Sequence, residues 1–413
     1  MLSEELNERI TRVGPGTPGG ELLRRYWQPV CIAAELAGGE PKRRLRILGE
    51  DLVVFRDGRG RYGLVAEHCA HRGTSLFYGF VEEQGIRCAY HGWLYDAAGR
   101  CLEQPLEPHG STFCRRVRQP AYPVQQLAGL LFAYMGPAPA PLLPRWDALV
   151  RTDGHRKLTT GDVSCNWVQT QENTVDPTHF SFLHGHMAET LDLPDPGGYT
   201  RPLLEYGFQP FEWGILTSWS WGSDGRFGAE RAGGNPLIFP NALAHAVGPS
   251  RWINWRVPID DTHTRIFSLE FRACEDGTVV DETDPPARSV RPWRDADGEY
   301  ALDSIVAQDT MAWETQGPIV DRSREHLGAG DRGIVMFRQL LLREIAVVEE
   351  GGEPMGLVRD PKRNEMLELP TLFVEGDPAS ATVAGERVVE ARPMRSVFDD
   401  RHTVFQVSQG GTV

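Results

Sequence analysis

The sequence predicts an α+β protein in which a small all-β domain of antiparallel sheets comes before a larger domain of helices and strands. Three observations support this fold class. The chain has 413 residues, more than one average hydrophobic core organises. Alternating apolar and polar residues, broken by turn dipeptides, fill most of the first third of the chain. Segments with helical spacing of apolar residues appear in the remaining two thirds.

Residues 1–25 are predicted to form an N-terminal helical segment. Thr17 can cap a helix, Pro18 suits the first helical position, and Pro29 ends the pattern. We therefore place a short helix directly before the β domain.

Residues 26–138 are predicted to form the small β domain. Turn dipeptides at Asp57-Gly58 and Ala98-Gly99 interrupt its alternating pattern, as in an antiparallel meander. The segment 136–144, GPAPAPLLP, is rich in proline, which excludes a regular helix or a central strand. We place the boundary to a second domain, residues 139–413, in this segment.

The second domain is predicted to mix helices with strands. We predict helical segments at 166–187, which contains a proline interruption, at 301–317 and at 333–350. We predict strands at 251–259 and 262–271. The tail after Gly351 is rich in proline, glycine and charge, and we expect extended polypeptide that lies over the body of the domain.

Charge and composition exclude several classes of protein. The net charge of −14 argues against binding along nucleic acid. No run approaches the roughly 18 to 20 apolar residues of a membrane span, and MLSEELNERI does not resemble an export signal, so we expect a cytoplasmic protein. Seven widely spaced cysteines do not form a disulfide framework, which leaves thiols or metal ligands.

Two short turns each contain one cysteine and one histidine. Cys69 and His71 stand in the first turn, and Cys88 and His91 stand in the second. Zinc could be held by such a set, but zinc fingers usually take two cysteines from one element and two histidines from another. One thiolate and one imidazole per turn suit a two-iron, two-sulfur cluster in which the thiolates bind one iron and the imidazoles the other.

This pattern, C-x-H followed by C-x-x-H, resembles the motif of the Rieske iron-sulfur family. Gly73 and Gly92 fit the motif, because glycine lets the backbone fold closely around the sulfides. Respiratory-chain Rieske proteins have an additional cysteine in each loop, joined as a disulfide. Here Thr74 follows the first loop, and Ala89 and Tyr90 stand in the second. The resemblance is therefore to the Rieske centres of oxygenases and of their ferredoxins.

A second motif lies in the larger domain. The stretch ENTVDPTHFSFLHGHM resembles the N-x-x-D-x-x-H-x4-H motif of the Rieske non-haem iron oxygenases. The resemblance implies that His179 and His184 bind a mononuclear Fe(II), and that Asn173 and Asp176 belong to the same site.

The spacing of these histidines requires a local departure from a regular helix. Positions five apart on an α-helix differ in direction by about 140°, so we expect a non-helical turn around Phe182-Leu183. His186 lies nearer to the helix face of His179 and remains the alternative to His184.

The third iron ligand should be a carboxylate from a later helix. Asp309 resembles the aspartate of the Q-D-x4-E-x-Q/M-G-P-I-x-D-R segment in the phthalate dioxygenase branch, with Asp303 and Glu314 as alternatives. Two histidines and one carboxylate leave neighbouring positions on ferrous iron open for dioxygen.

Asp176 has two interpretations. Because it precedes Pro177, it could cap a helix that begins there. The resemblance implies instead that its carboxylate accepts a hydrogen bond from His179 and reaches a Rieske histidine, His91, across a subunit boundary in a head-to-tail homotrimer.

The resemblance covers nearly the whole chain and implies a helix-grip catalytic domain with a central antiparallel sheet flanked by helices. It implies the terminal oxygenase of a multicomponent system, with one Rieske [2Fe-2S] cluster and one mononuclear Fe(II) per chain. Reduction of dioxygen to one inserted oxygen and one water takes four electrons, of which the substrate supplies two. NADH would supply the other two through a separate reductase, and in some systems a ferredoxin, because no G-x-G-x-x-G follows a strand here.

The resemblance is strongest to phthalate dioxygenase-like oxygenases and aromatic O-demethylases. It favours oxidative O-demethylation of a methoxylated, lignin-derived aromatic acid of the biphenyl or vanillate type. Phthalate-type ring dihydroxylation, or hydroxylation of another aromatic carboxylate, is the alternative reaction. A non-enzymatic Rieske electron-transfer protein is the alternative of another class.

Candidate substrate residues lie between positions 194 and 259. They are Arg251, Asn254, Arg256 and His245, together with Trp213, Trp219, Trp221, Trp252 and Trp255. Aromatic side chains suit a flat ring, and an arginine can bind a carboxylate through two hydrogen bonds.

Overall fold

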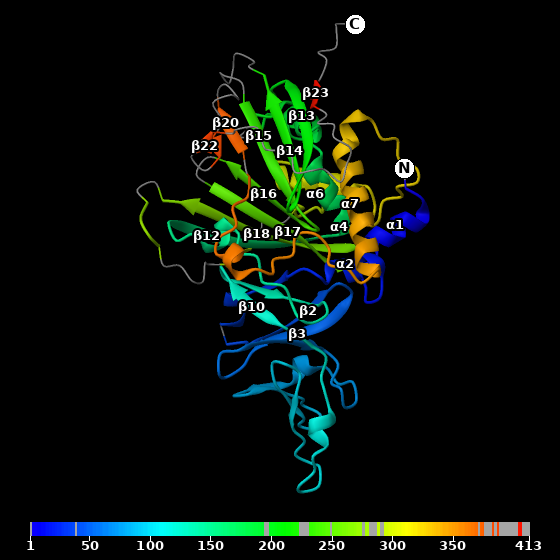
Figure 1. The fold of residues 1–413 in the computed structure, drawn as a ribbon, viewed down its shortest axis with the longest axis vertical. Coiled ribbons are helices and arrows are strands. Elements are labelled where there is room, and N and C mark those ends of the chain that lie inside the picture. Colours follow the sequence, from blue (N-terminus) through cyan, green and yellow to red (C-terminus); the bar gives the residue numbers. More distant parts are fainter. Residues whose placement is uncertain are drawn as a thin grey trace.

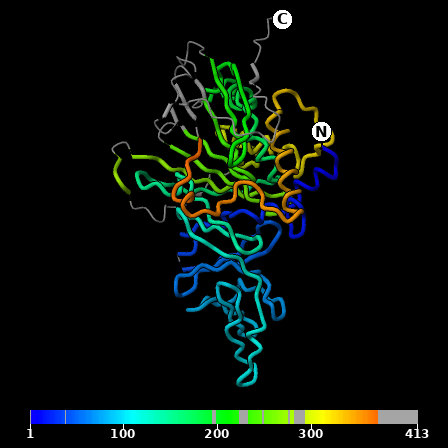
Figure 2. Tube along the Cα trace, viewed as in Figure 1, coloured from blue at the N-terminus to red at the C-terminus, as the bar shows by residue number. Residues whose placement is uncertain are grey.

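The computed structural model describes residues 2–37, 39–193, 198–222, 231–247, 250–274, 277–280, 287–289 and 293–370, with short strands at 372–375, 382–383, 386–387 and 404–406. A β module lies at one end of the molecule, and a larger body built on a broad sheet lies at the other (Figure 1). The trace in Figure 2 enters through the body, passes through the module and returns to the body. The α+β fold class predicted from the sequence is confirmed.

The N-terminal segment forms two helices, α1 (Glu4–Thr11) and α2 (Pro18–Leu23). The Thr17 hydroxyl oxygen accepts a hydrogen bond from the Gly20 N–H at 3.2 Å, as expected for a helix cap. Both helices pack against α7 (Arg332–Glu349) of the body.

The β module contains three small sheets, in each of which all strands pair antiparallel. The first contains β1 (Gln28–Ile32), β11 (Leu130–Ala133) and β10 (Val124–Leu127). The second contains β2 (Lys42–Ile47), β3 (Glu50–Arg56), β4 (Tyr62–Ala66) and β9 (Ala121–Tyr122). The third contains β5 (Phe80–Glu82), β6 (Gly85–Arg87), β7 (Leu94–Tyr95) and β8 (Cys101–Glu103). The two predicted turn dipeptides connect β3 to β4 and β7 to β8.

One large sheet forms the centre of the body. Its strands, in spatial order, are β19 (Ala287–Ser289), β12 (Gly154–Val163), β18 (His263–Ala273), β17 (Ser250–Asp260), β16 (Ala242–Val247), β15 (Arg231–Ile238), β14 (Gly214–Trp221), β13 (Leu203–Phe211) and β23 (Val404–Gln406). In addition, β20 (Leu372–Glu375) pairs with β15. The pairs are antiparallel except for β12 with β19. Strands β17 and β18 agree with the two strands predicted from the sequence.

The body also contains a set of helices. They are α3 (Asp147–Val150), α4 (Trp167–Glu172), η4 (Asn173–Val175), η5 (Phe180–His186), α5 (Met187–Thr190), α6 (Ile305–Thr315) and α7. The segment η5 is a π-helix, so the turn expected around Phe182-Leu183 is wrong and a wider helix replaces it. Residues 351–370 follow an irregular path that bridges to Leu142 and Trp146, and most of the tail beyond them lies outside the described residues.

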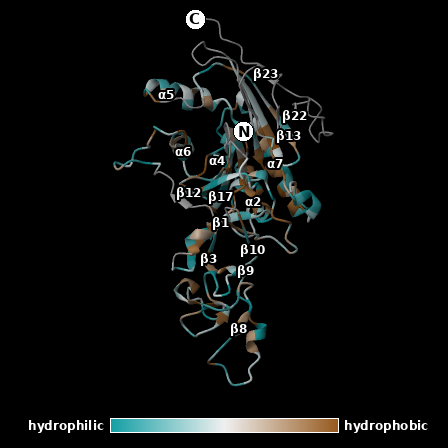
Figure 3. Cartoon of the chain, turned by 90° about the vertical axis from the view of Figure 1, so that its left-hand side faces the viewer, coloured by the Kyte–Doolittle hydropathy of each residue, from teal (hydrophilic) through white to brown (hydrophobic). Residues whose placement is uncertain are grey.

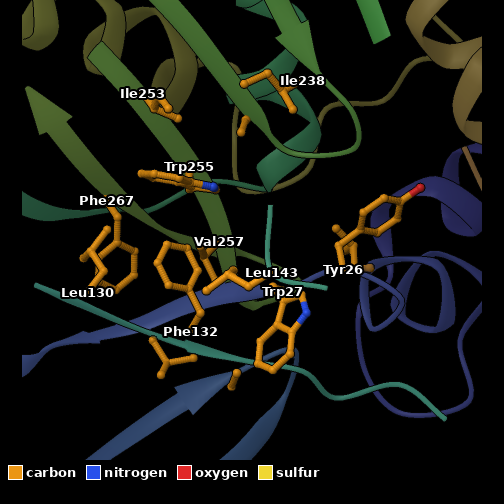
Figure 4. Packing of buried hydrophobic residues seen from close by; sticks show 14 of the residues in the cluster. Tyr26, Trp27, Leu130, Phe132, Leu143, Ile238, Ile253, Trp255, Val257 and Phe267 are labelled. Carbon is orange, nitrogen blue, oxygen red and sulfur yellow. The ribbon is translucent and has the colours of Figure 1, made fainter. Parts of the chain in front are cut away.

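The β module and the body share one hydrophobic core. Phe132 of β11 meets Trp255 of β17 edge to face, with ring centroids 5.7 Å apart, and both side chains are buried (Figure 4). The body therefore holds the base of the module in a fixed position. The module's far end projects away, so that β8 and α6 lie well apart along the long axis (Figure 3).

In the part of the chain that the structure describes, no helix is both long and apolar enough to cross a membrane.

Candidate metal centres and substrate cavity

The first group of candidate ligands lies on two tight turns of the module, one after β4 and one between β6 and β7. The Gly73 N–H donates to the Cys69 carbonyl at 2.8 Å, and the Gly92 N–H donates to the Cys88 carbonyl at 3.0 Å. Both glycines have φ near +75°, where a side chain would be strained (+76° and +73°). Glycine at these positions therefore allows each turn to close tightly.

The four candidate side chains converge between these turns. Cys69 and Cys88 are buried, whereas His71 and His91 are partly exposed and their ring centroids lie 4.5 Å apart. The Tyr95 hydroxyl lies 3.3 Å from Cys69 Sγ. Thiols on the inside and imidazoles toward solvent are the arrangement that a Rieske cluster needs.

Two features of this site fit a [2Fe-2S] cluster. The buried Nδ1 of His71 has no hydrogen-bond partner among the described residues, as expected of a nitrogen reserved for a metal. Burial raises the pKa of the Cys88 thiol, while the backbone N–H groups of Tyr90 and His91 act in the opposite direction. Such N–H donors stabilise cluster sulfurs and tune the potential.

The second group of candidate ligands lies in the body. Ligand atoms of His179, His184 and Asp309 all lie within 4.8 Å of one another. The Asp309 Oδ1 is 3.7 Å from His179 Nε2 and 3.4 Å from His184 Nε2. These three side chains could hold one metal ion on a single face, with open positions opposite.

The π-helix explains how histidines five residues apart meet. Hydrogen bonds in a π-helix join residues five apart, which places such residues almost above one another. His179 immediately precedes η5 and His184 lies within it, and their ring centroids are 5.1 Å apart. The π-helix therefore brings together two histidines that a regular α-helix would hold apart.

Hydrogen bonds fix the orientation of both imidazoles. The Nδ1 of His184 donates to Gln308 Oε1 at 2.8 Å, and the Gln308 amide in turn donates to the Leu302 carbonyl at 2.9 Å. The Nδ1 of His179 donates to the backbone carbonyl of Asp176. Each Nδ1 therefore carries the ring proton, which makes Nε2 the nitrogen that could bind a metal.

The carboxylate of Asp176 contacts its own turn more closely than it contacts the histidine. Its Oδ1 accepts from the backbone N–H and the hydroxyl of Thr178 at 3.0 and 2.5 Å, whereas Oδ2 lies 3.7 Å from His179 Nδ1. Asn173 lies closer to the group, with Nδ2 3.2 Å from His179 Nε2 and 3.3 Å from Asp309 Oδ1.

The electrostatics of the group favour metal binding. Burial lowers the pKa of His179, which keeps the imidazole neutral. Burial alone would raise the pKa of Asp309, but hydrogen bonding and charge interactions with His184 outweigh it and leave this pKa below its ordinary value. Neutral imidazole and ionised carboxylate are the forms that bind metals.

The alternative ligands lie outside this group. The His186 side chain is 65% exposed and lies beside Glu189. Glu314 accepts hydrogen bonds from the Ser164 N–H and from Arg294, and Asp303 is exposed. None of these three joins the triad in the described structure.

A cavity of about 370 Å³ opens beside the triad. Asn254, Arg256 and His245 line it, but Arg251 does not. Alternate residues of a strand face opposite sides of the sheet, so Arg251 points away from Asn254 and Arg256. The Arg251 Nε lies 3.8 Å from Asp147 Oδ2 instead.

Arg256 brings a buried positive charge to the cavity. Arg256 is only 4% exposed, and its Nε and Nη1 have no hydrogen-bond partner among the described residues. Burial lowers the pKa of Arg256 to about 10, partly offset by Asp309. Burial also lowers the pKa of His245 to about 4, so this ring, stacked on Trp252, is neutral near pH 7.

Aromatic side chains also line the cavity. Phe180 contacts Tyr199 and Trp219 with centroids 5.2 Å apart in each case, and Trp221 completes the cluster. Of the other predicted tryptophans, Trp213 and Trp255 belong to the main core.

Sequence reasoning missed several lining residues. Ile305 and Trp313 lie four residues before and after Asp309 on α6, so helical spacing could have identified them. Tyr199 and Trp293 lie outside any regular periodic segment, and no pattern in the sequence marks them.

The β module holds two cysteines and two histidines on its turns, and the body holds two histidines and one carboxylate beside a cavity. Together these two groups define a class of protein. It is the terminal oxygenase component of iron-sulfur oxygenase systems.

Comparison with known proteins identifies the family. Residues 26–123 match the Rieske [2Fe-2S] domain, and residues 293–368 match the family described as LigXa C-terminal domain like. The 5,5'-dehydrodivanillate O-demethylase oxygenase subunit of Sphingobium sp. (strain NBRC 103272 / SYK-6) is 39% identical over 93% of this chain and 91% of its own length. The phthalate 4,5-dioxygenase oxygenase subunit of Pseudomonas putida is 32% identical over 84% and 89%.

Solved structures show the same fold. Pseudomonas putida CBB5 NdmA superimposes with a TM-score of 0.59 at 22% identity, over 81% of this chain and 93% of that one. The oxygenase and ferredoxin complex of carbazole 1,9a-dioxygenase gives a TM-score of 0.58 at 20% identity, over 82% and 93%. The chain belongs to the Rieske non-haem iron oxygenases, as an oxygenase subunit that carries a Rieske [2Fe-2S] cluster and a mononuclear iron.

Proposed function

We propose that this oxygenase removes a methyl group from a methoxylated aromatic acid. The observation that carries the proposal is the cavity itself, in which a buried guanidinium with unpartnered nitrogens and a wall of aromatic rings lie beside the metal-ligand triad. The dehydrodivanillate O-demethylase subunit is a relative over nearly the full length of the chain, which supports the same reaction class.

We propose that Cys69, His71, Cys88 and His91 hold the cluster, and that His179, His184 and Asp309 hold the iron. With both groups bound, the cluster supplies electrons one at a time and ferrous iron supplies the site of dioxygen activation. The overall change is balanced when the aromatic methyl ether, dioxygen, two electrons and two protons give the phenol, formaldehyde and water.

The cavity residues have separate roles in this proposal. Arg256 binds the substrate carboxylate, because a buried guanidinium gains most from an anionic partner. Neutral His245 and the amide of Asn254 hydrogen-bond the oxygen substituents of the ring without adding charge. Trp219 and Trp221 hold the ring and keep water away from the triad.

We propose a head-to-tail homotrimer, or stacked trimers, in which electrons pass between chains. Within one chain β8, which pairs with the strand β7 that follows the Cys88 turn, lies well apart from α6, which carries Asp309 (Figure 3). Exposed apolar side chains surround both ends of the proposed contact, with Tyr90 at 57% and Phe113 at 46% near the cluster and Phe182 at 76% on η5. Exposed aromatic residues of this kind are typical of interfaces.

Charge supports the same contact. Residues 26–138 contain 13 lysines and arginines against 11 acidic residues, although the whole chain has a net charge of −14. The module is therefore slightly basic and the remainder strongly acidic, which favours attachment of one chain's module to the next chain's body. In this contact Asp176, which accepts from His179 through its backbone carbonyl, would present its half-buried carboxylate to the neighbouring chain's His91.

A separate protein should deliver the electrons. We propose an NADH-dependent reductase, with or without a ferredoxin, as the partner, since the solved carbazole 1,9a-dioxygenase oxygenase forms a complex with ferredoxin. A cytoplasmic location remains a prediction.

The test is product analysis with a panel of methoxylated aromatic acids, a Rieske oxygenase reductase and NADH. We expect oxygen consumption with formaldehyde and the phenol in equal amounts. A cis-dihydrodiol without formaldehyde would replace the proposal by ring dihydroxylation, the reaction in the name of the phthalate 4,5-dioxygenase relative.

Iron analysis tests the ligand assignment. We expect about three irons per chain, and we expect Asp309→Ala to remove one of them while the visible absorbance of the cluster remains. If Asp309→Ala keeps all its iron, the assigned triad is not the iron site.

A further inference from the structure

One wall of the cavity is made by a tryptophan that occupies the space left by a glycine. Gly161 on β12 and Trp293 both line the cavity. A Cβ atom at position 161 would come within 2.6 Å of Trp293 Cζ2 and 3.2 Å of Cε2. The indole therefore lies directly on the backbone of the strand, a position that any side chain at 161 would prevent.

The indole is held in this position from several directions. Its Nε1 donates to the Asp162 carbonyl at 3.0 Å, and its ring packs against the cluster that contains Ile266 and Trp313. Trp293 lines the cavity and is also partly exposed. Trp293 is thus a thin wall between the cavity and solvent rather than part of the deep core.

The chain that follows Trp293 is tied to the helix that carries Asp309. Arg294 donates to Glu314 at 3.0 Å, and the Tyr300 hydroxyl donates to the same carboxylate at 2.9 Å. Glu314 also accepts from the Ser164 N–H at 2.7 Å. This explains why Glu314, an alternative iron ligand in the sequence, is absent from the triad.

The volume of the cavity makes the position of this wall important for the size of the substrate. At about 370 Å³ the cavity lies near the lower end of the roughly 300 to 1,000 Å³ range of ligand sites. A one-ring acid leaves part of such a space empty, so the position of the walls decides how much of a second ring the cavity can also hold.

We infer that Trp293, seated on Gly161, is a specificity-determining residue that limits the size of the aromatic acid the cavity accepts. The inference rests on the proposed oxidation of aromatic acids, and it adds which part of the site selects among them. Trp293 touches neither the candidate iron ligands nor Arg256 through any described hydrogen bond, so it should act on substrate size and not on metal binding.

The experiment compares Trp293→Ala and Trp293→Phe with the wild type. Calorimetry measures the Kd of the iron-loaded protein for a one-ring methoxybenzoate and for a two-ring biaryl acid, and turnover is recorded separately. We expect the ratio of two-ring to one-ring affinity to rise at least about tenfold in Trp293→Ala and less in Trp293→Phe. Iron content and cluster absorbance should stay at wild-type values.

A second pair of variants tests the seat of the indole. Gly161→Ala should displace the ring and change the affinity ratio, but it should have little further effect in a Trp293→Ala background, because the clashing atoms are gone. Gly207→Ala on β13 is the matched control, since its Cβ would meet only the Ser218 hydroxyl, at 3.2 Å.

The outcomes separate this inference from the proposed function. An unchanged affinity ratio in Trp293→Ala, or additive effects of the two substitutions, would overturn the role of Trp293 even if the wild type demethylates its substrate. A wild type that binds these acids with the expected ratios but releases no formaldehyde would overturn O-demethylation and leave the size limit standing. Binding of neither acid would overturn both.

Discussion

At the residue scale, Arg256 places a positive charge in the cavity, where burial lowers the pKa of its guanidinium. Arg256→Met keeps the length of the side chain and removes the charge. We expect kcat/KM for an aromatic acid to fall about 100-fold, as for the loss of one partner of a buried charge pair. The midpoint of thermal unfolding should rise, because an unpaired cation no longer has to be buried.

Two comparisons make this prediction specific. The methyl ester of the same acid should lose little in Arg256→Met, since it presents no carboxylate. Arg251→Met, on the opposite face of β17, should leave the ratio of acid to ester turnover unchanged. Equal losses for acid and ester would mean that Arg256 supports the fold of the cavity and not the carboxylate.

Gln308 is a second residue whose role can be isolated. Its Oε1 accepts from His184 Nδ1, and its amide is held by the Leu302 carbonyl. Gln308→Ala should weaken iron binding about 10- to 100-fold, because the imidazole loses the group that orients it. Iron affinity is measured by competition with a chelator. Gln316→Ala, an exposed glutamine at the end of the same helix, is the control and should retain wild-type affinity.

At the element scale, α4 is joined to α7 and the preceding loop by a buried ionic network. Glu172 accepts from Arg322 at 2.9 Å through each carboxylate oxygen and from Arg338 at 2.6 Å, and all three side chains are buried. Since Glu172 directly precedes Asn173, this network holds the turn that leads into the metal-ligand triad.

Glu172→Gln should therefore destabilise the protein strongly. Two buried guanidinium groups would lose their shared anion, at a cost of about 3 to 5 kcal/mol in the free energy of unfolding. Glu349→Gln, which breaks an exposed pair with Arg9, should cost about 1 kcal/mol or less. Denaturant titration of both variants checks the contrast, and similar losses in the two would show that burial of the network contributes little.

The same network predicts a pH dependence. Burial raises the pKa of Glu172, but Arg322 and Arg338 more than offset it, so the folded pKa lies below the ordinary value of 4.5. The stabilisation is therefore complete at neutral pH and is lost as the pH falls below 4.5 toward the folded pKa. Glu172→Gln should remove this part of the acid sensitivity.

Elements with a clear local signal could be predicted from the sequence, and elements set by long-range packing could not. Thr17 caps α2 and Pro18 begins it, and β17 and β18 carry enough buried apolar residues to be predicted as strands. The π-helix places His184 beside Gln308, 124 residues away in the chain, whereas the spacing of the histidines predicts only that a regular helix cannot bring them together.

The candidate site shows the same division. The cysteines and histidines of both motifs carry their signal in short spacings, and the structure brings each set together. Closeness in sequence predicts that Arg251 joins Asn254 and Arg256, but strand alternation places it on the opposite face. Trp293 has no periodic context, and only the folded chain reveals its contact with Gly161.

At the scale of the whole molecule, the module that carries the cluster turns lies below the body, and α6, which carries Asp309, lies within that body (Figure 1). A ring of identical subunits would bring the module of one chain to the body of the next, since a head-to-tail interface closes by rotation. Two inactive variants can test this arrangement. His71→Ala should remove the cluster and keep the mononuclear iron, and Asp309→Ala should do the opposite.

Each variant expressed alone should fail to oxidise substrate, whereas co-expression of the two should restore activity. In randomly mixed rings an intact cluster faces an intact iron at about a quarter of the interfaces, so the mixture should reach about that fraction of wild-type turnover. Size-exclusion chromatography with light scattering checks that the mixed assemblies have the wild-type mass. Electron transfer within each chain would instead leave the co-expressed protein as inactive as its parents, because neither chain then holds both metal groups.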